Sequence, residues 1–230
     1  MTASRTARER VRAELIREIT DIARRQLATD GAGGLSLRAV AREMGMVSSA
    51  IYRYFPSRDD LLTTLIIDGY NAIGEAVERA EAACPRDDFA GRWLAACHAL
   101  RDWAVAHPHE YALLYGSPVP GYHAPQDTIA ARVRDVTVLG GIVSDAWRAG
   151  AMRAPAIEPP AELEGEAAGV REHMPGVPDG VVWQTVAAWT ALYGWLSFEV
   201  FGQFNGTIED RRAAFDHSMR LTAATMGLAQ

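Results

Sequence analysis

The sequence predicts an all-α protein of about nine or ten helices, and three observations support this fold class. Apolar residues recur every three or four positions along most of the chain, which is the spacing of one helix face. No segment of any length alternates apolar and polar residues as a strand does. Clusters of glycine and proline interrupt the helical pattern, for example in residues 30–34, 117–125 and 150–180.

The first predicted helix covers residues 8–29. Its apolar positions follow the helical period and are Val11, Leu15, Ile19, Ile22, Ala23 and Leu27. The glycine-rich stretch at residues 30–34 then ends this helix. Ser36 offers a side-chain oxygen that caps the helix following it.

Residues 35–60 predict two short helices joined by a tight turn, with a third helix starting at once. Two helices that cross steeply need a small residue where their backbones meet, and Ala41 is that residue. Gly45 tolerates the positive φ that a tight turn requires. Ile51 packs the second helix, residues 47–54, back onto the first. This arrangement is typical of a helix-turn-helix, which places one helix in the major groove of DNA.

The rest of the chain predicts further helices. Ser57 caps a helix that ends before Pro85, and Asp59 and Asp60 in its first turn suit the helix dipole. Later helices are expected at residues 89–106, from Pro108, and at 128–149, 161–172, 179–204 and 208–227. The helix at residues 161–172 is a short one inside the connection at residues 150–180.

Composition excludes several classes of protein. The 230 residues are 49% hydrophobic and 23% charged, which fits a globular chain with one large or two modest cores. No run approaches the roughly 18 to 20 apolar residues of a membrane span. Since the N-terminus also lacks the apolar core of a signal peptide, we expect a cytoplasmic protein. Cys84 and Cys97 lack the spacing of a disulfide framework or metal site, so we expect no metal and no cofactor.

The sequence also argues against an enzyme. It has no Ser-His-Asp order, metal-ligand cluster or glycine-rich phosphate loop, and Glu110 and Glu199 are isolated carboxylates. An all-α enzyme is the alternative from another functional class.

Charge is divided unevenly along the chain, although the net charge is −6. Residues 1–58 hold eleven arginines and six acids, a net +5, whereas residues 59–230 hold twelve arginines and 23 acids, a net −11. The chain contains no lysine. A basic N-terminal part suits contacts with phosphates, and an acidic remainder limits non-specific binding to nucleic acid.

The N-terminal part of the chain resembles the DNA-binding domain of the TetR family of bacterial transcriptional regulators. The resemblance rests on a long first helix, on LSLRAVAREMG at residues 35–45 and on SSAIYRYFPSRDDLL at residues 48–62. It implies a DNA-binding domain at residues 1–70 and a ligand-sensing and dimerisation domain at residues 71–230. We therefore expect a homodimeric repressor that a small-molecule effector releases from palindromic operator DNA. An activator, or a regulator that responds to a partner protein, is the alternative with the same fold.

The resemblance also implies which residues contact DNA. Val47, Ser48 and Ser49 start the recognition helix and face base edges, and Arg38 on the preceding helix reaches a base or the backbone. The side chains expected at phosphates, three with hydroxyl groups and one basic, are Ser36, Tyr52, Tyr54 and Arg58. Two competing interpretations are that Ser36 is only a helix cap and that Tyr52 is half-buried against the first helix.

The predicted sensing domain is rich in aromatic residues, and all six tryptophans lie within it. Such a domain suits an apolar or aromatic effector, although core packing explains each aromatic residue equally well. The candidates for lining the pocket are Trp103, His107, Tyr111, Tyr115 and Trp147.

The last two predicted helices carry the expected dimer interface, since family members pack such a pair from each subunit into a four-helix bundle. The apolar residues at helical spacing on the first are Val182, Val186, Trp189, Tyr193 and Leu196. Those on the second are Leu221, Thr225 and Leu228. We expect effector binding among the central helices to shift the helix that starts at Ser57 and so to change the spacing of the two recognition helices.

Overall fold

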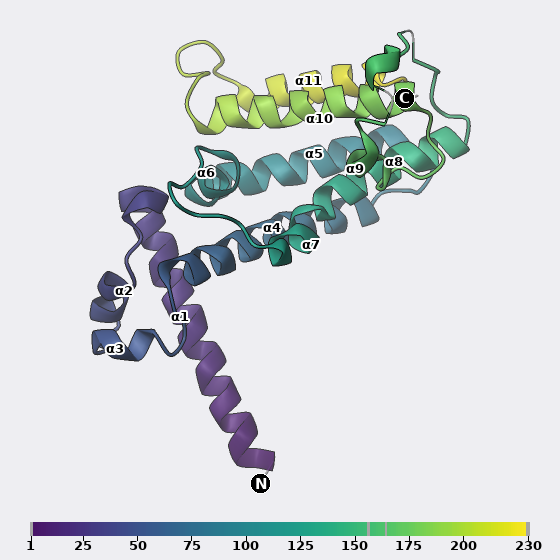
Figure 1. The fold of residues 1–230 in the computed structure, drawn as a ribbon. Helices are drawn as coiled ribbons and strands as arrows, with labels where there is room; N and C mark the ends of the chain where they lie inside the picture. Colours follow the sequence, from purple (N-terminus) through teal and green to yellow (C-terminus); the bar gives the residue numbers. More distant parts are fainter. Residues whose placement is uncertain (1, 156, 164, 229–230) are drawn as a thin grey trace. The chain divides into compact units, whose positions relative to one another are not determined.

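The computed structural model describes residues 2–155, 157–163 and 165–228, which fold mainly as helices (Figure 1). The α-helices are α1 (Thr2–Gly34), α2 (Leu37–Glu43), α3 (Ser48–Ile51), α4 (Arg58–Ala82), α5 (Phe89–Ala106), α6 (Pro108–Tyr115), α7 (Ile129–Arg132), α8 (Arg134–Arg148), α9 (Ala168–Arg171), α10 (Asp179–Val200) and α11 (Arg211–Thr225). Short 3-10 helices lie at Gln126–Thr128 and Ala161–Leu163. Within these described ranges the one strand-like pairing is an isolated bridge between Met152 and Leu228. The predicted all-α fold class is confirmed.

The chain forms two compact units. The N-terminal unit consists of Met1–Gly69 and Pro108–Thr128, and the C-terminal unit consists of Tyr70–His107 and Ile129–Gln230. Helix α4 therefore contributes residues to both units. The domain boundary at residue 70 stays a prediction, because compactness does not show whether a segment folds or functions alone.

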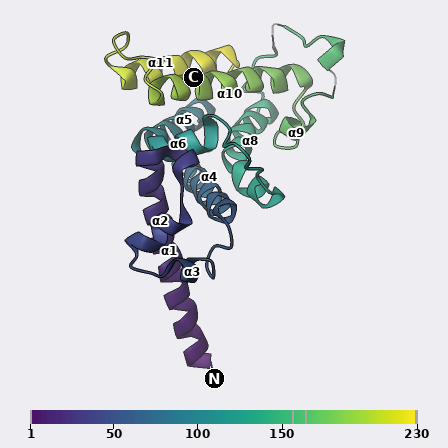
Figure 2. The same ribbon diagram turned by 60° about the vertical axis from the view of Figure 1, so that its left-hand side comes forward.

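The core of the N-terminal unit is built from α1, α2, α3 and the start of α4, which Figure 2 shows gathered together. Its buried apolar residues include Ile19, Ile22, Leu27, Leu37, Val40, Ala41, Ile51, Phe55, Leu61 and Leu65. Leu113, Val119 and Tyr122, from the segment after α5, pack against the same core. The Tyr122 hydroxyl lies 2.9 Å from Oγ1 of Thr63 on α4.

Helix α1 extends further at both ends than the sequence pattern predicts. It begins at Thr2, and its last turn is interrupted at Gly31, whose φ of 66° and ψ of 177° are not helical. Val11, expected on the apolar face, is 55% exposed. The apolar pattern of α1 therefore reaches beyond the part of the helix that packs on the core.

The C-terminal unit is arranged around α5, which packs against α8, α10 and α11. Its largest fully buried side chains include Trp93 and Leu100 of α5, Ile142 of α8 and Phe215 of α11. The helix expected at residues 128–149 is divided at Val133 into α7 and α8. In the part of the chain that the structure describes, no helix combines the length and apolar character needed to cross a membrane.

The predicted apolar dimer face on α10 and α11 is partly wrong. Val182 and Leu196 are 0% exposed and Leu228 is 3% exposed, because these residues pack inside their own chain. Leu221, by contrast, is 61% exposed. Helical spacing identified an apolar face correctly, but on α10 that face serves the core of the C-terminal unit.

Candidate DNA interface and ligand pocket

Helix α2 ends in a turn whose geometry depends on glycine. Gly45 has a φ of 67°, and its N–H donates to the Arg42 carbonyl at 3.1 Å. The Met46 N–H donates to the Ala41 carbonyl at 2.8 Å, so the two bonds form the motif that closes many helices at a left-handed residue. A side chain at Gly45 would strain this turn, since other L-residues disfavour positive φ.

Helix α3 is shorter than predicted and has two distinct faces. Its α-helical part is Ser48–Ile51, after which residues 52–54 continue as turns. Ala50 and Ile51 are buried in the core of the N-terminal unit. Val47 is 71% exposed, Tyr52 is 42% exposed, and Ser48 and Ser49 are also exposed. We call these four exposed residues the α3 face.

Ser36 and Arg38 lie at the start of α2. Ser36 is half-buried, and its hydroxyl oxygen accepts the Ala39 N–H at 3.4 Å, so it caps the helix as one interpretation expected. Arg38 is exposed. It forms no ion pair or hydrogen bond through its side chain with any residue that the structure describes.

Tyr54 is half-buried, and its ring faces an arginine that the sequence analysis did not select. The guanidinium of Arg12 lies 5.3 Å from the centre of the Tyr54 ring, within the range of a cation–π interaction. Arg12 also donates to the Arg53 carbonyl at 3.3 Å. No local pattern indicates this pairing, because the two side chains come from α1 and from the turn after α3.

Arg58 is held by the end of α1. Its guanidinium donates to the carbonyl oxygens of Ala32 at 2.6 Å and Gly33 at 3.4 Å. Beside it, Ser57 caps α4: its hydroxyl oxygen accepts the Asp60 N–H at 3.1 Å. The predicted phosphate ligand therefore also ties the beginning of α4 to the end of α1.

Positive charge in the N-terminal unit is free near α3 and paired further along α1. Arg42 and Arg53 are exposed and, like Arg38, make no side-chain ion pair with any described residue. Arg24 contacts Asp21, Asp68 and Glu110 at 2.8, 3.0 and 3.2 Å, and Arg25 contacts Glu43 at 2.8 Å. Arg38, Arg42 and Arg53 therefore leave uncompensated positive charge on the helix-turn-helix, where it is available to a phosphate backbone.

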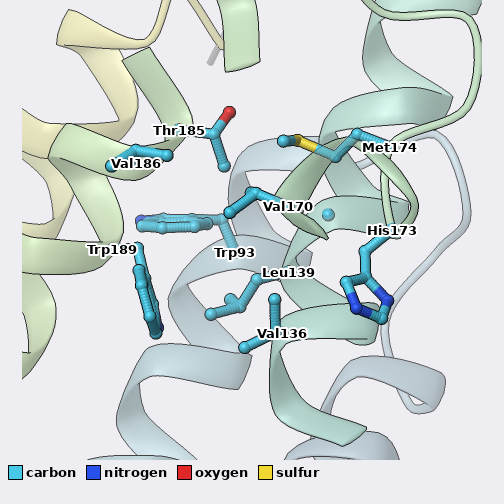
Figure 3. A pocket seen from close by; sticks show the side chains of 10 residues that line it. Trp93, Val136, Leu139, Val170, His173, Met174, Thr185, Val186 and Trp189 are labelled. Atoms are coloured by element: carbon cyan, nitrogen blue, oxygen red, sulfur yellow. The ribbon is translucent and has the colours of Figure 1, made fainter. Parts of the chain in front are cut away.

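The C-terminal unit contains a mostly apolar pocket between α5, α8, α10 and the segment that includes α9 (Figure 3). It is lined by Trp93, Val136, Leu139, Gly140, Val170, His173, Met174, Thr185, Val186 and Trp189. The cavity volume is only about 10 Å³, so the side chains nearly fill the pocket.

None of the five residues predicted to line a ligand pocket lines this one. Trp103 is buried in α5 and stacks on His107, with ring centres 5.1 Å apart. Tyr111 and Tyr115 belong to the N-terminal unit, where their ring centres lie 5.0 Å apart. Trp147 lies half-buried near the end of α8. The structure thus distributes the five residues over different sites.

Sequence patterns do not reveal the pocket because helix α5 buries a broad arc of its surface. This arc runs from Arg92 to Arg101, and both Trp93 and Trp103 lie within it. Periodicity cannot show which of these tryptophans borders a cavity. Gly140 is also essential to the lining, since a Cβ there would lie 2.6 Å from the His173 carbonyl oxygen. That close approach is visible only in three dimensions.

Comparison with known proteins gives consistent matches along the chain. Residues 19–65 match the family described as bacterial regulatory proteins, tetR family, and residues 93–222 match the tetracyclin repressor-like C-terminal domain. The HTH-type transcriptional regulator Rv1816 of Mycobacterium tuberculosis (strain ATCC 25618 / H37Rv) is 39% identical over 226 residues, which cover 96% of this chain and 94% of that protein.

Two solved structures are also similar over most of their length. The crystal structure of SCO4313 is 32% identical with a TM-score of 0.76, covering 94% of this chain and 98% of that one. A protein of unknown function from Rhodococcus sp. RHA1 is 26% identical with a TM-score of 0.69, covering 94% and 96% of the two chains.

Proposed function

The chain belongs to the tetR family of bacterial regulatory proteins and is a DNA-binding transcriptional regulator, and we propose that it acts as a homodimeric repressor released from its operator by a small molecule. The family is one of regulators, not of enzymes. We propose that the protein acts in the cytoplasm, where bacterial DNA lies.

The α3 face is the observation that carries the proposal for DNA recognition. Serine hydroxyls donate to or accept from base edges, and Val47 suits a thymine methyl group. Arg38 offers the bidentate guanidinium that best distinguishes guanine. Tyr52 contributes an exposed hydroxyl for a phosphate, and the unpaired Arg42 and Arg53 add positive charge beside it. Ser36, Tyr54 and Arg58 already have partners in the chain and are proposed as additional phosphate contacts.

The dimer is proposed to form through the exposed sides of α10 and α11. On α10, Ala187, Ala191, Gly194, Phe198 and Phe201 are exposed at helical spacing. Phe198 and Phe201 are 53% and 45% exposed, which is unusual for aromatic residues unless another surface covers them. An isologous pairing of this face would present two α3 faces to a palindromic site.

Gly194 offers a sharp test of the dimer. A Cβ at Gly194 meets no atom of its own chain within 4 Å, so Gly194→Arg leaves the fold of one subunit undisturbed but places charge in the interface. Gly141→Arg in α8 is the control, because a Cβ there is equally free. We expect light scattering to give a monomer for Gly194→Arg and a dimer for Gly141→Arg. A dimer in both variants would remove this face from the proposal.

Effector release is proposed to run through Arg134. This residue starts α8, which lines the pocket, and its guanidinium binds Glu78 of α4 at 2.7 and 2.8 Å. It also donates to the backbone and side-chain oxygens of Asn71 at 3.1 and 2.9 Å. Because α4 continues from these residues to Arg58, a ligand that moves α8 would also act on the helix that follows the DNA-binding motif.

Selection of bound DNA from a random pool tests the proposed function. We expect the full chain to enrich a palindromic sequence whose half-sites lie about one helical turn apart, or a multiple of it. Binding without any sequence enrichment would contradict the proposal that the α3 face reads bases.

A further inference from the structure

A groove lies between α1 and the turn that follows α3, and it carries positive charge. It is lined by Ala7, Arg8, Val11, Arg12 and Tyr54, and its volume is about 330 Å³. The lining includes two arginines and no acidic residue. All five residues belong to the N-terminal unit. An open groove with two cations, a phenol ring and exposed apolar carbon suits an anionic group that is part of a larger molecule.

The groove continues the side of α1 that packs on the core. Ile19 and Ala23 are 0% exposed in that core, and Arg8 and Arg12 precede them at helical spacing on the same side. Further toward the N-terminus this side is no longer covered, since Arg8 is exposed and Val11 is 55% exposed. Figure 2 shows α1 continuing past α2 and α3 in this direction. One side of the helix is therefore apolar where it meets the core and carries two arginines beyond it.

Arg12 joins this groove to the α3 face. Its guanidinium lies 5.3 Å from the centre of the Tyr54 ring and donates to the Arg53 carbonyl at 3.3 Å, and Arg53 directly follows Tyr52 of the α3 face. A guanidinium carries several N–H donors, so others remain available to a ligand. Arg8 makes no ion pair or hydrogen bond through its side chain with any residue whose side chain the structure describes. Both cations of the groove can therefore bind an anion from outside.

The position of the groove beside the α3 face favours duplex DNA as the source of the anion. A recognition helix places its first residues on base edges, and phosphates line both walls of the major groove that the helix enters. Val47 lies at the N-terminal end of α3, whereas the groove borders the turn after its other end. A DNA backbone at that end would meet Arg8 and Arg12, and its deoxyribose carbons would contact the exposed Val11.

We propose that this groove binds a phosphate of the DNA backbone beside the bases that the α3 face contacts, with Arg8 and Arg12 as its cations. The Tyr54 ring holds Arg12 in position for this contact. The DNA interface then includes residues of α1 that precede the family match at residues 19–65. The assignment rests on the proposed function in one respect, since that function supplies the DNA. The contact adds affinity without sequence preference, because every base pair carries the same phosphates.

The salt dependence of DNA binding tests the groove on the full chain. Arg8→Ala removes one cation of the groove, and Arg17→Ala is the matched control, because Arg17 is an exposed arginine on the opposite side of the same helix. For each contact removed, the salt slope should decrease in magnitude by about 0.9, so the affinity lost should be about 3.5-fold larger at 50 mM than at 200 mM salt. Arg17→Ala should keep the slope of the unaltered chain. Equal slopes in the two variants would overturn the assignment.

Neutral groups in the DNA backbone then locate the phosphate. A methylphosphonate replaces one charged phosphate oxygen by a methyl group, and it can be placed at each position of the selected duplex in turn. At one position per half-site, the unaltered chain and Arg17→Ala should lose affinity, whereas Arg8→Ala should lose less, because part of that contact is already absent. Fluorescence anisotropy measures each affinity. Losses of the same size in all three proteins at every position would contradict the proposal.

Duplex DNA of mixed sequence separates this proposal from the proposed function. A phosphate contact carries no sequence information, so the difference in slope between Arg8→Ala and Arg17→Ala should also appear on this DNA. If selection enriches an operator but the two variants have equal slopes, the groove assignment fails and the proposed function stands. If the slopes differ but no sequence is enriched, base reading fails and the groove assignment stands. A chain that binds neither duplex would contradict both.

Discussion

Arginine side chains have opposite roles in the two units of the molecule. In the N-terminal unit, Arg38, Arg42 and Arg53 are exposed near the helix-turn-helix, without an ion pair to any described residue. In the C-terminal unit, Arg92 and Arg101 are 3% and 7% exposed and bind carboxylates. These three arginines of the N-terminal unit are therefore available to a partner, whereas the two buried arginines of the C-terminal unit serve internal structure.

This difference explains how an acidic protein can bind DNA. Arg92 contacts Glu81 at 2.7 Å and Asp145 at 2.8 Å, and Arg86 and Arg148 pair with the same two acids at 2.8 and 3.1 Å, so these carboxylates are neutralised locally. Three unpaired cations of the N-terminal unit belong to the helix-turn-helix region: Arg38 and Arg42 are on α2, and Arg53 is in the turn after α3, the helix proposed to enter the major groove. Net charge alone says little about nucleic-acid binding, whereas the pairing of each arginine shows where a phosphate can bind.

The largest expected effect concerns Arg101. Arg101→Met removes the cation that binds both oxygens of Glu199 at 2.5 and 2.9 Å, leaving a buried carboxylate uncompensated. We expect the free energy of unfolding to fall by about 3–5 kcal/mol in urea titrations. Arg101→Met combined with Glu199→Leu should lose less, because it leaves no buried charge. A loss below about 1 kcal/mol in the single variant would mean that the pair behaves as a surface pair.

Arg38→Ala should leave stability unchanged, because the side chain is exposed and unpaired. If Arg38 reads a base, the variant should lose roughly 1–3 kcal/mol of operator affinity and relax one position of the selected sequence. Fluorescence anisotropy with operator and random DNA measures both quantities. Equal losses on the two DNAs would reassign Arg38 to the phosphate backbone.

Arg58 shares features of the exposed, unpaired arginines and of the buried, paired ones. It is partly exposed, and it donates hydrogen bonds to carbonyl oxygens at the end of α1. Arg58→Ala should lower the free energy of unfolding by about 1 kcal/mol, through loss of its bond to the Ala32 carbonyl. If it also contacts a phosphate, the salt slope of DNA binding should decrease in magnitude by about one unit per subunit. Reduced stability with an unchanged slope would leave Arg58 with a structural role alone.

The smallest expected effect is a change in the pH dependence of stability at Asp135. This buried carboxylate accepts a hydrogen bond from the Tyr193 hydroxyl and not from an arginine. Burial raises its pKa above 3.8, although the Tyr193 hydrogen bond opposes the change. The folded state therefore holds this proton more tightly than the unfolded state, and stability falls as pH rises from the unfolded pKa through the folded pKa. Asp135→Asn should show a smaller loss between pH 4 and 7 in urea titrations. Parallel pH profiles for the two proteins would contradict the raised pKa.

The helix-turn-helix could be predicted because its determinants are local. The Ser36 cap bonds a residue three positions away, and the turn at Gly45 closes through bonds within α2 and its next residues. Ala41 and Ile51 are 0% exposed, as their spacing predicted. Which residues contact DNA stays a prediction, although Val47, Ser48, Ser49 and Tyr52 are exposed as that role requires.

The ligand pocket was beyond sequence reasoning because its lining comes from residues 93 to 189 of the chain. Helix α5 buries about half of its circumference, with Arg92 and Arg101 at the two edges of this arc, so apolar periodicity does not identify its pocket side. Arginines are normally exposed, and these two can be buried because carboxylates from other helices pair with them. Long-range pairings of this kind depend on the tertiary arrangement.

The segment Pro108–Thr128 has a practical consequence for protein engineering. Chimaeric regulators are commonly conceived as a DNA-reading head exchanged at a single splice point. In this chain such an exchange at residue 69 would separate α1 and α4 from Leu113, Val119 and Tyr122, and Arg24 from Glu110. A functional graft must therefore carry the distant segment with it, or redesign the surface that the segment leaves uncovered.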